Sequence, residues 1–284
     1  MGYYGLAKII GHLPFAFRGR HRLVSALYPE GGKPRIQRVA RIKGSRRSIH
    51  ADSNQHIGWH VLVYGCYEGN LLRTMKRLLK GFSLRVAIDV GANIGHHTLV
   101  LSNLFKRVYS FEPIPEFREV LAANLYLNNI DNVEIIPLAL GRSYNRAQMA
   151  LLFHHNEPQT ASVNTGAYSF EDPFRWEVRE TEMNSLDHFV RSRGLTDVDY
   201  LKVDTDGSEE DILQGAADTL IRFQPLIQVE LTEDAKQWRR DLSLPNLVRF
   251  LKQFGYEMLD SNGRPHGSAT FNGNYFALPK RMIK

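Results

Sequence analysis

Carboxylates and glycines at the ends of two apolar runs are the residues best suited to hold a ligand. The run Val86–Val90 contains Asp89 and leads into a turn that begins at Gly91. A second run, Tyr109–Phe111, ends on Glu112, which follows Asp89 by 23 residues. In a parallel sheet the first arrangement brings backbone close to a ligand, and the second presents a carboxylate to ribose hydroxyls. This spacing predicts a nucleoside site.

The glycine spacing indicates which kind of nucleoside fits. A dinucleotide site needs Gly-x-Gly-x-x-Gly, whose backbone cradles a pyrophosphate at a helix N-terminus. This chain has Gly91-Ala92-Asn93-Ile94-Gly95 instead, so the phosphate cradle is missing and a nucleoside without phosphates, such as S-adenosylmethionine, fits better. We expect its amino-acid part to contact Asp89 and the glycine turn, and its ribose to contact Glu112. Ala139 and Leu140 follow a third apolar run, where they would touch adenine.

Further acids follow two later apolar runs, and they suit removal of a proton. Tyr200–Val203 leads to Asp204, and Leu226–Val229 leads to Glu230. Both carboxylates therefore belong at the edge of the sheet that holds the expected nucleoside site. A carboxylate within hydrogen-bond reach of a hydroxyl can take its proton as a new bond forms at the oxygen. We predict Asp204 as the base, with Glu209 and Glu230 as the next candidates.

Two other interpretations of these acids stay open. The acidic run 209–211 follows Ser208 and could simply stabilise the N-terminus of a helix. Acids that end the fourth and fifth strands, here Asp204 and Glu230, also resemble the paired magnesium ligands of catechol-type methyltransferases. A magnesium ion bound there would lower the pKa of the substrate hydroxyl.

An alternation of strands and helices must position these residues. The apolar runs named above predict buried parallel strands, and Val133–Leu138 predicts another. Helical stripes cover 117–125 and 245–254. Tyr256–Leu259 and Tyr275–Leu278 predict a closing hairpin-like pair. Strands that alternate with helices in this way indicate an α/β fold with a doubly wound sheet.

Residues 1–80 are expected to form a basic α+β extension, and residues 81–284 the nucleoside-binding domain. The extension has helix-like spacing near its start, strand-like spacing over 35–67 and then a helical stripe. Within the domain, an insertion over about residues 142–198 separates two of the expected strands. Because an insertion at this edge would shape the substrate pocket, His154 inside it is a candidate base facing the substrate.

Composition and charge limit the classes of protein. The chain has 284 residues, one cysteine and no apolar run as long as a membrane span, so we expect a soluble cytoplasmic protein without disulfides or a signal peptide. Residues 1–50 hold eleven Lys or Arg against one acid, a net charge of +10, and the other 25 basic and 29 acidic residues leave −4. Such a block suits an anionic acceptor, a solvated face, or peripheral contact with the inner face of a membrane. Nucleic acid is not expected, since no RNA-binding motif accompanies the block.

Three blocks taken together resemble a known family. Val86–Gly95, Ser110–Pro113 and Leu201–Glu209 are similar to motifs of the FkbM-type S-adenosylmethionine-dependent methyltransferases. The similarity extends to Tyr67-Glu68 and Pro225–Glu230. It implies a class I methyltransferase fold, which is Rossmann-like and has a mostly parallel seven-stranded sheet with one antiparallel strand. It also implies, as the usual activity, O-methylation of sugars, glycans or natural products.

The resemblance also implies roles for individual positions. Asp204-Thr205-Asp206-Gly207 stands where the family usually has Asp-x-Glu-Gly, so the carboxylate of residue 206 has a shorter reach. An active-site role falls on Asp204 and Glu209. Cofactor roles fall on the residues of the first two motifs: Asp89, Gly91, Ala92, Asn93, Gly95, Glu112 and Pro113.

We therefore expect methyl transfer from S-adenosylmethionine to a hydroxyl of a sugar, a polysaccharide or a glycosylated metabolite. Cationic residues from 33–47 and the 149–180 part of the insertion would cover the acceptor, which suits an acceptor that carries phosphate or carboxylate. Three alternatives stay open. One is an RNA methyltransferase that uses the basic arm, and another is a non-catalytic interaction protein on a methyltransferase scaffold. The third is a nicotinamide oxidoreductase, which would share the sheet although the phosphate-binding glycines are missing. The sequence leaves the acceptor, the metal dependence and the oligomeric state undetermined.

Overall fold

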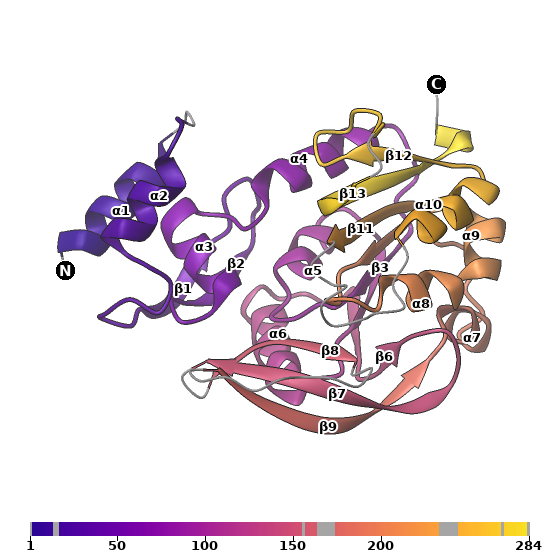
Figure 1. Ribbon diagram of the computed structural model, residues 1–284, viewed down its shortest axis with the longest axis horizontal. Coiled ribbons are helices and arrows are strands. Elements are labelled where there is room, and N and C mark those ends of the chain that lie inside the picture. The colour runs from indigo at the N-terminus through magenta and orange to yellow at the C-terminus, as the bar shows by residue number, and fades with distance from the viewer. Residues whose placement is uncertain are drawn as a thin grey trace.

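The computed structural model describes residues 2–13, 17–154, 157–163, 174–232, 244–267 and 270–282. A central sheet covered by helices makes up one side of the molecule, and a helical N-terminal unit stands at the other side (Figure 1). A second sheet with long strands lies below the central sheet in the same view. The motifs expected to bind the nucleoside belong to the central sheet.

Seven strands form the central sheet, in the order β12-β13-β11-β10-β3-β4-β5. The pairs from β11 to β5 are parallel, and β13 is antiparallel to both of its neighbours. The expected doubly wound sheet with one antiparallel strand is therefore confirmed. In chain order the strands are β3 (Val86–Val90), β4 (Arg107–Phe111), β5 (Val133–Ile136), β10 (Tyr200–Val203), β11 (Leu226–Thr232), β12 (Tyr256–Asp260) and β13 (Asn272–Pro279).

The strand order reverses beside β3, which lies between β10 and β4. Ligands of doubly wound sheets bind in the crevice beyond the carboxyl ends of the strands at such a switch point. The residues directly after β3, β4 and β10 are Gly91, Glu112 and Asp204. The topology thus brings the three motifs singled out in the sequence to one place.

The strands are mostly apolar, as expected of a sheet that is covered on both faces. All four residues of β10 are buried, and β3 is buried from Ala87 onward. In the described ranges no helix combines the length and apolar character needed to cross a membrane. The helices that follow the strands are α5 (His96–Leu101), α6 (Pro115–Leu127), α7 (Leu186–Ser192), α8 (Glu209–Gln214), α9 (Ala217–Phe223), α10 (Leu244–Gln253) and the 3-10 turn Lys280–Met282.

The insertion between β5 and β10 forms a four-stranded sheet of order β6-β9-β7-β8. Its two long strands are β7 and β9, and they include residues 149–153 and 176–180. Its strands are β6 (Ala139–Leu140), β7 (Asn145–His154), β8 (Glu157–Val163) and β9 (Phe174–Asn184).

The N-terminal unit packs its helices around Trp59, whose indole N–H donates a 3.0 Å hydrogen bond to the carbonyl of Tyr28. Its elements are α1 (Gly2–His12), α2 (Arg20–Leu27), β1 (Gln37–Arg41), β2 (Ser48–Asp52) and α3 (His56–Tyr64), followed by α4 (Gly69–Leu78). The strand-like interpretation of residues 57–63 is wrong, because these residues form α3. Leu62 is buried along with Trp59, Val61 and Val63, so the segment is apolar on more than one face and does not alternate as a strand would.

Two amide side chains, one in α6 and one on the residue directly after it, attach the N-terminal unit to the domain. The backbone N–H of His50 donates to Oδ1 of Asn124 at 2.8 Å, and that of Ser48 donates to Oδ1 of Asn128 at 2.8 Å. Nδ2 of Asn128 in turn donates to the carbonyl of Ser48 at 2.7 Å. Ile49 of β2 is fully buried in the core cluster that also contains Leu121 of α6. The extension is therefore packed on the domain through both polar and apolar contacts.

Candidate functional site

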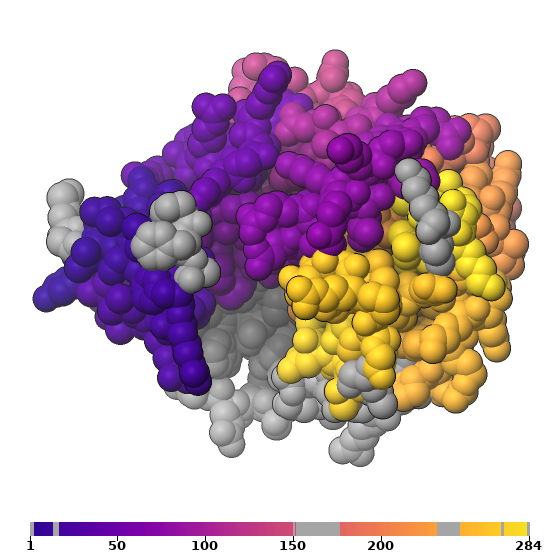
Figure 2. Space-filling model, turned by 90° about the horizontal axis from the view of Figure 1, so that it is seen from above, coloured from indigo at the N-terminus to yellow at the C-terminus, as the bar shows by residue number. Residues whose placement is uncertain are grey.

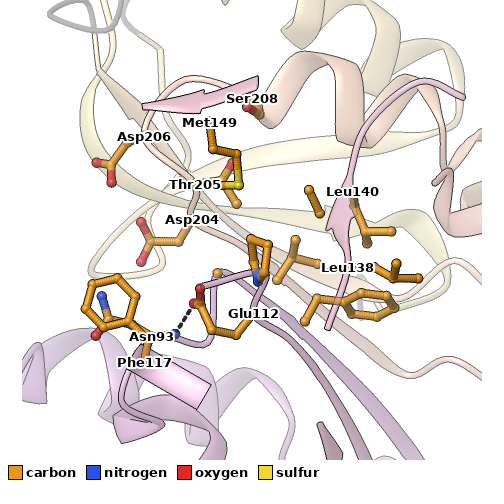
Figure 3. Close-up of a pocket in the computed structure, with 15 residues that line it drawn as sticks. Asn93, Glu112, Phe117, Leu138, Leu140, Met149, Asp204, Thr205, Asp206 and Ser208 are labelled. Atoms are coloured by element: carbon orange, nitrogen blue, oxygen red, sulfur yellow. Dashed lines mark hydrogen bonds between the residues drawn. The ribbon is translucent and has the colours of Figure 1, made fainter. Parts of the chain in front are cut away.

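A cavity of about 540 Å³ opens at the carboxyl ends of β3, β4 and β10 (Figure 3). Polar groups from the strand ends face apolar side chains from α6, β6 and β7 across the cavity. The residues that line it are Val90, Gly91, Asn93, Phe111, Glu112, Pro113, Phe117, Leu138, Ala139, Leu140, Met149, Asp204, Thr205, Asp206 and Ser208.

Gly91 allows the first loop to approach the last one. Its φ is +78°, and a Cβ atom built there would lie 1.9 Å from the carbonyl oxygen of Asp204. Its N–H donates to the carbonyl of Phe111 at 3.1 Å, which ties the loop to the end of β4. A side chain at residue 91 would therefore push apart the two loops that carry the site.

We expect Gly91→Ala to lower the free energy of unfolding by about 2 kcal/mol or more, because positive-φ strain adds to a backbone collision. Denaturant unfolding followed by circular dichroism measures this. Gly194→Ala is the matched control, since Gly194 has a φ of +60° but no atom within 4 Å of its ideal Cβ. Equal losses in the two variants would contradict the collision, because only the backbone strain is common to both.

Glu112 is held in place by backbone donors. The N–H of Asn93 donates to its Oε2 at 2.7 Å, the contact drawn as a dashed line in Figure 3, and the N–H of Ile114 donates to its Oε1 at 3.0 Å. Each carboxylate oxygen keeps a further lone pair for a ligand hydroxyl. The side chain is 4% exposed, and burial raises its pKa to about 7 despite these two donors.

Asp89 lies one layer behind the cavity wall. It is completely buried, its Oδ2 accepts a 2.7 Å hydrogen bond from the Thr98 hydroxyl, and its Oδ1 lies 3.5 Å from Nζ of Lys202. Ala92 and Gly95 also lie behind the residues that line the cavity, where Gly95 precedes α5 in the left-handed conformation. The geometry thus gives Asp89 the task of positioning the first loop and the buried ammonium.

Asp204 stands in the wall beside that ammonium. Nζ of Lys202, whose side chain is 2% exposed, lies 3.1 Å from Oδ2 of Asp204. Burial acts to raise the pKa of Asp204, but the Lys202 charge and a hydrogen bond with Glu230 outweigh it and lower that pKa. Burial and the neighbouring Asp204 charge together raise the pKa of Glu230 well above its usual value. At neutral pH Glu230 is therefore protonated and Asp204 is ionised.

Glu68, which precedes α4, reaches the same group of side chains. Its Oε1 accepts a 2.7 Å hydrogen bond from Nδ2 of Asn274, and its Oε2 lies 3.3 Å from Nε2 of His97. Burial raises the pKa of Glu68 to about 7, and the Asp204 charge acts in the same direction. Burial also lowers the pKa of His97, so its ring is neutral. The N-terminal part of the chain thus contributes an acid to the site.

Glu209 holds the loop after β10 in place through hydrogen bonds. Its Oε1 accepts hydrogen bonds from the N–H of Thr205 at 2.9 Å, from the Thr205 hydroxyl at 3.1 Å and from the N–H of Gly207 at 3.2 Å. Its side chain does not line the cavity and is 4% exposed. Asp206 does line it, in the left-handed conformation with φ +52°.

The magnesium interpretation does not fit the donors. In the described part of the chain no group of three or more His, Cys, Asp or Glu residues is arranged to hold a metal ion. The ammonium of Lys202 already pairs with Asp204 and takes the place of a cation there. Glu230 carries a proton that it would have to lose before it could bind a metal. His154 belongs to β7, but its side chain lies outside the described residues, so its role as a base stays a prediction.

The wall fits S-adenosylmethionine by its chemistry. Leu138, Ala139 and Leu140 offer apolar surface to a purine, Glu112 offers acceptors to ribose hydroxyls, and the loop at Gly91 offers backbone to an amino-acid group. Six expected cofactor residues line the cavity together with Asp204: Gly91, Asn93, Glu112, Pro113, Ala139 and Leu140.

Sequence reasoning missed several residues of the site. Phe117 was assigned only to the core stripe of a helix, and Lys202 only to an apolar strand. The signal for Lys202 was available, since a lysine inside a buried strand needs an acid partner. Met149 comes from the inserted sheet, and its place in the wall depends on tertiary structure.

A doubly wound seven-stranded sheet of this order, with a nucleoside-type cavity at its switch point, defines the class I fold of S-adenosylmethionine-dependent methyltransferases. Within that class, the sequence profile of the methyltransferase FkbM domain matches residues 89–258. The chain belongs to the FkbM methyltransferase family.

Two curated relatives share this part of the chain. Methyltransferase 1 of Beauveria bassiana (strain ARSEF 2860) is 29% identical over 146 residues, which cover 46% of this chain and 58% of the relative. Methyltransferase sdnD of Sordaria araneosa is 27% identical over 154 residues, which cover 45% of this chain and 59% of the relative. The chain thus matches less than two thirds of the length of each relative.

Solved structures of methyltransferases are similar at low identity. The FkbM methyltransferase of Methylobacillus flagellatus KT is 16% identical, with 69% of this chain and 43% of that chain covered and a TM-score of 0.39. SMU.1697c, a putative methyltransferase from Streptococcus mutans solved with S-adenosylhomocysteine, is 13% identical, with 72% and 96% covered and a TM-score of 0.42. The assignment of the fold rests on the sheet order described above.

Proposed function

We propose that this chain transfers a methyl group from S-adenosylmethionine to a hydroxyl of a sugar-containing acceptor. The observation that carries this proposal is the carboxylate of Asp204, which lies in the wall of the nucleoside cavity 3.1 Å from Nζ of Lys202. Transfer to a hydroxyl requires a base within reach of the hydroxyl proton. Membership of the FkbM family supports the methyl-transfer part of the proposal.

When bound, S-adenosylmethionine supplies an electrophilic methyl carbon. Asp204 accepts the proton of the acceptor hydroxyl at its carboxylate. Lys202 balances the negative charge of Asp204 until that proton arrives, and the hydrogen bond from protonated Glu230 restricts the orientation of the carboxylate. Glu112 fixes the nucleoside end, which limits the reacting groups to a productive geometry.

The cofactor half of the proposal is tested at Glu112. Glu112→Gln should weaken S-adenosylhomocysteine binding about 10- to 100-fold, because charge-assisted hydrogen bonds of about 1.5–3 kcal/mol are lost. Because burial raises the pKa of Glu112 to about 7, affinity in the wild type should increase as the pH rises through that value and the carboxyl ionises. Titration calorimetry at several pH values measures both effects.

Glu119→Gln, at an exposed position on the nearby helix α6, is the matched control and should bind like the wild type. A Glu112→Gln variant with unchanged affinity would overturn the ribose assignment. Folded wild-type protein that binds no S-adenosylhomocysteine would overturn the proposed activity itself.

A further inference from the structure

A second cavity of about 700 Å³ has Glu68 and Asn274 in its lining, two residues that lie close to the carboxylates of Asp204 and Glu230. It lies between the start of α4 and the hairpin of β12 and β13. Figure 2 shows these two parts beside each other, α4 in purple and the hairpin in gold to yellow, and Asn274 and Glu68 bond across them. The lining residues are Glu68, Asn70, Leu71, Asp260, Ser261, His266, Asn272, Gly273, Asn274 and Tyr275.

The inner wall of this cavity joins the catalytic pair. Asn274 of β13 lies directly opposite Glu230 of β11 in the strand register, and Glu68 is within electrostatic reach of both Asp204 and Glu230. Oε2 of Glu68 lies 3.3 Å from Nε2 of His97, whereas Oδ1 of Asn274 is buried without a hydrogen-bond partner among the described residues. A buried acceptor without a donor, beside a carboxyl group at the inner end of an open cavity, is suited to a hydroxyl group of a ligand.

The outer wall has the chemistry of a site for a neutral polyhydroxylated ligand. Short polar side chains from Asn70, Ser261 and Asn272 line it, with the ring of Tyr275 at one side. Two carboxylates, Glu68 and Asp260, line it as well, while Lys and Arg are absent from its described lining. An anionic group would be repelled here, whereas sugar hydroxyls would find both donors and acceptors.

The neighbouring groove has the opposite charge. Arg73, Arg77 and Arg264 line it, together with Asn70, which also lines the second cavity. Arg73 and Arg77 are four residues apart on α4 and hence on one face of the helix. No acid lines the groove in the described residues, and none of the three arginines forms a salt bridge there. Guanidinium groups arranged in this way are suited to bind phosphate or carboxylate.

We propose that the acceptor binds across both parts. Its methylated sugar occupies the cavity between α4 and the β12–β13 hairpin, and an anionic group of the same acceptor lies on Arg73, Arg77 and Arg264. This inference rests on the proposed function, and it assigns the acceptor site to the C-terminal hairpin and α4. The sequence instead predicted that residues 33–47 and 149–180 cover the acceptor.

The test uses the full chain saturated with S-adenosylhomocysteine and six probes: glucose, galactose and mannose, each free and as the α-1-phosphate. Saturation-transfer NMR gives their dissociation constants at low salt. At least one hexose 1-phosphate should bind about tenfold or more tightly than its free hexose, as expected for a single charge-assisted contact. Arg73→Ala/Arg77→Ala should remove that difference. Because Nη2 of Arg73 also donates to Oδ1 of Asn70 in the sugar cavity, the ratio between each hexose 1-phosphate and its free hexose is the quantity compared. Ser261→Trp, which fills the cavity, should abolish binding of both.

Arg222→Ala/Arg249→Ala, two exposed arginines on α9 and α10, is the matched control and should bind every probe like the wild type. If Ser261→Trp does not fold, Asn272→Ala takes its place and should weaken the free hexoses. Binding of S-adenosylhomocysteine without any of the six probes would overturn this inference alone, as would an unchanged Arg73→Ala/Arg77→Ala variant. If the folded wild type did not bind S-adenosylhomocysteine at all, the proposed function itself would be overturned.

Discussion

An Asp204→Asn variant should lose about 10³-fold in kcat, within the range of about 10²- to 10⁴-fold that removal of a general base costs. Asparagine keeps the size of the side chain and its contact with Lys202 but cannot accept the hydroxyl proton. Its affinity for S-adenosylhomocysteine should stay within about threefold of the wild type, because removing a group that acts on the reaction leaves ground-state binding largely intact. The rate is measured as S-adenosylhomocysteine formed with the tightest-binding hexose 1-phosphate as acceptor.

The pH profile separates this role from a structural one. Because Lys202 and Glu230 outweigh burial and lower the pKa of Asp204, the wild-type rate should show no acid limb from this group near neutrality. Asp218→Asn, which changes an exposed acid paired with Arg191, is the control and should keep the wild-type rate. If Asp204→Asn retained its rate, the base would be another acid of the site, and Glu68 would be the next to test.

The fold and the nucleoside cavity could be predicted because their signals are local. An apolar run followed by Gly91 or Glu112 predicts both a strand and the position of its carboxyl end. The sheet order then follows from the rules of doubly wound folds, so Asp204 arrives beside Gly91 without any further information.

The acceptor side could not be predicted in the same way because it depends on contacts between distant segments. Glu68 and Asn274 are 206 residues apart in the chain, and neither is exceptional in its own neighbourhood. The helix α3 was missed for a related reason, since burial on several faces by α1 and α2 hides the helical period. Spacing along the chain carries no record of such packing.

Two acids of the motifs have structural tasks that the sequence could not distinguish from contact with a ligand. Asp89 is the last residue but one of β3 and Glu209 is the first residue of α8, so both lie close to the strand ends that carry Glu112 and Asp204. Their oxygens are instead used by Thr98 and Lys202 in one case and by the loop at Thr205 in the other. Their positions in the sequence therefore do not show which carboxylates contact a ligand and which hold a loop in place.

Lys202→Met should destabilise the fold by about 3–5 kcal/mol, because removing one partner of a buried ion pair leaves the other charge uncompensated. The ammonium is 2% exposed and serves both Asp89 and Asp204. Methionine fills a similar volume, so the loss reports the charge and not a void. Chemical denaturation monitored by circular dichroism gives the difference, and Lys106→Met, on the exposed surface, should stay within about 0.5 kcal/mol of the wild type.

The pH dependence of that loss has a definite sign. In the wild type the pKa of Asp204 is lowered, so the ion pair stabilises the fold above the usual carboxyl pKa and this contribution is lost as the pH falls through the folded value. In Lys202→Met, burial acts on Asp204 without the ammonium and raises its pKa, so the variant loses stability as the pH rises. The difference between the two proteins should therefore grow from about pH 4 to about pH 8. Adding Asp204→Asn to Lys202→Met should restore part of the stability at the higher pH, because one of the two carboxylates left without the ammonium is then neutral and only Asp89 remains. A double variant no more stable than Lys202→Met alone would show that the lysine acts through packing.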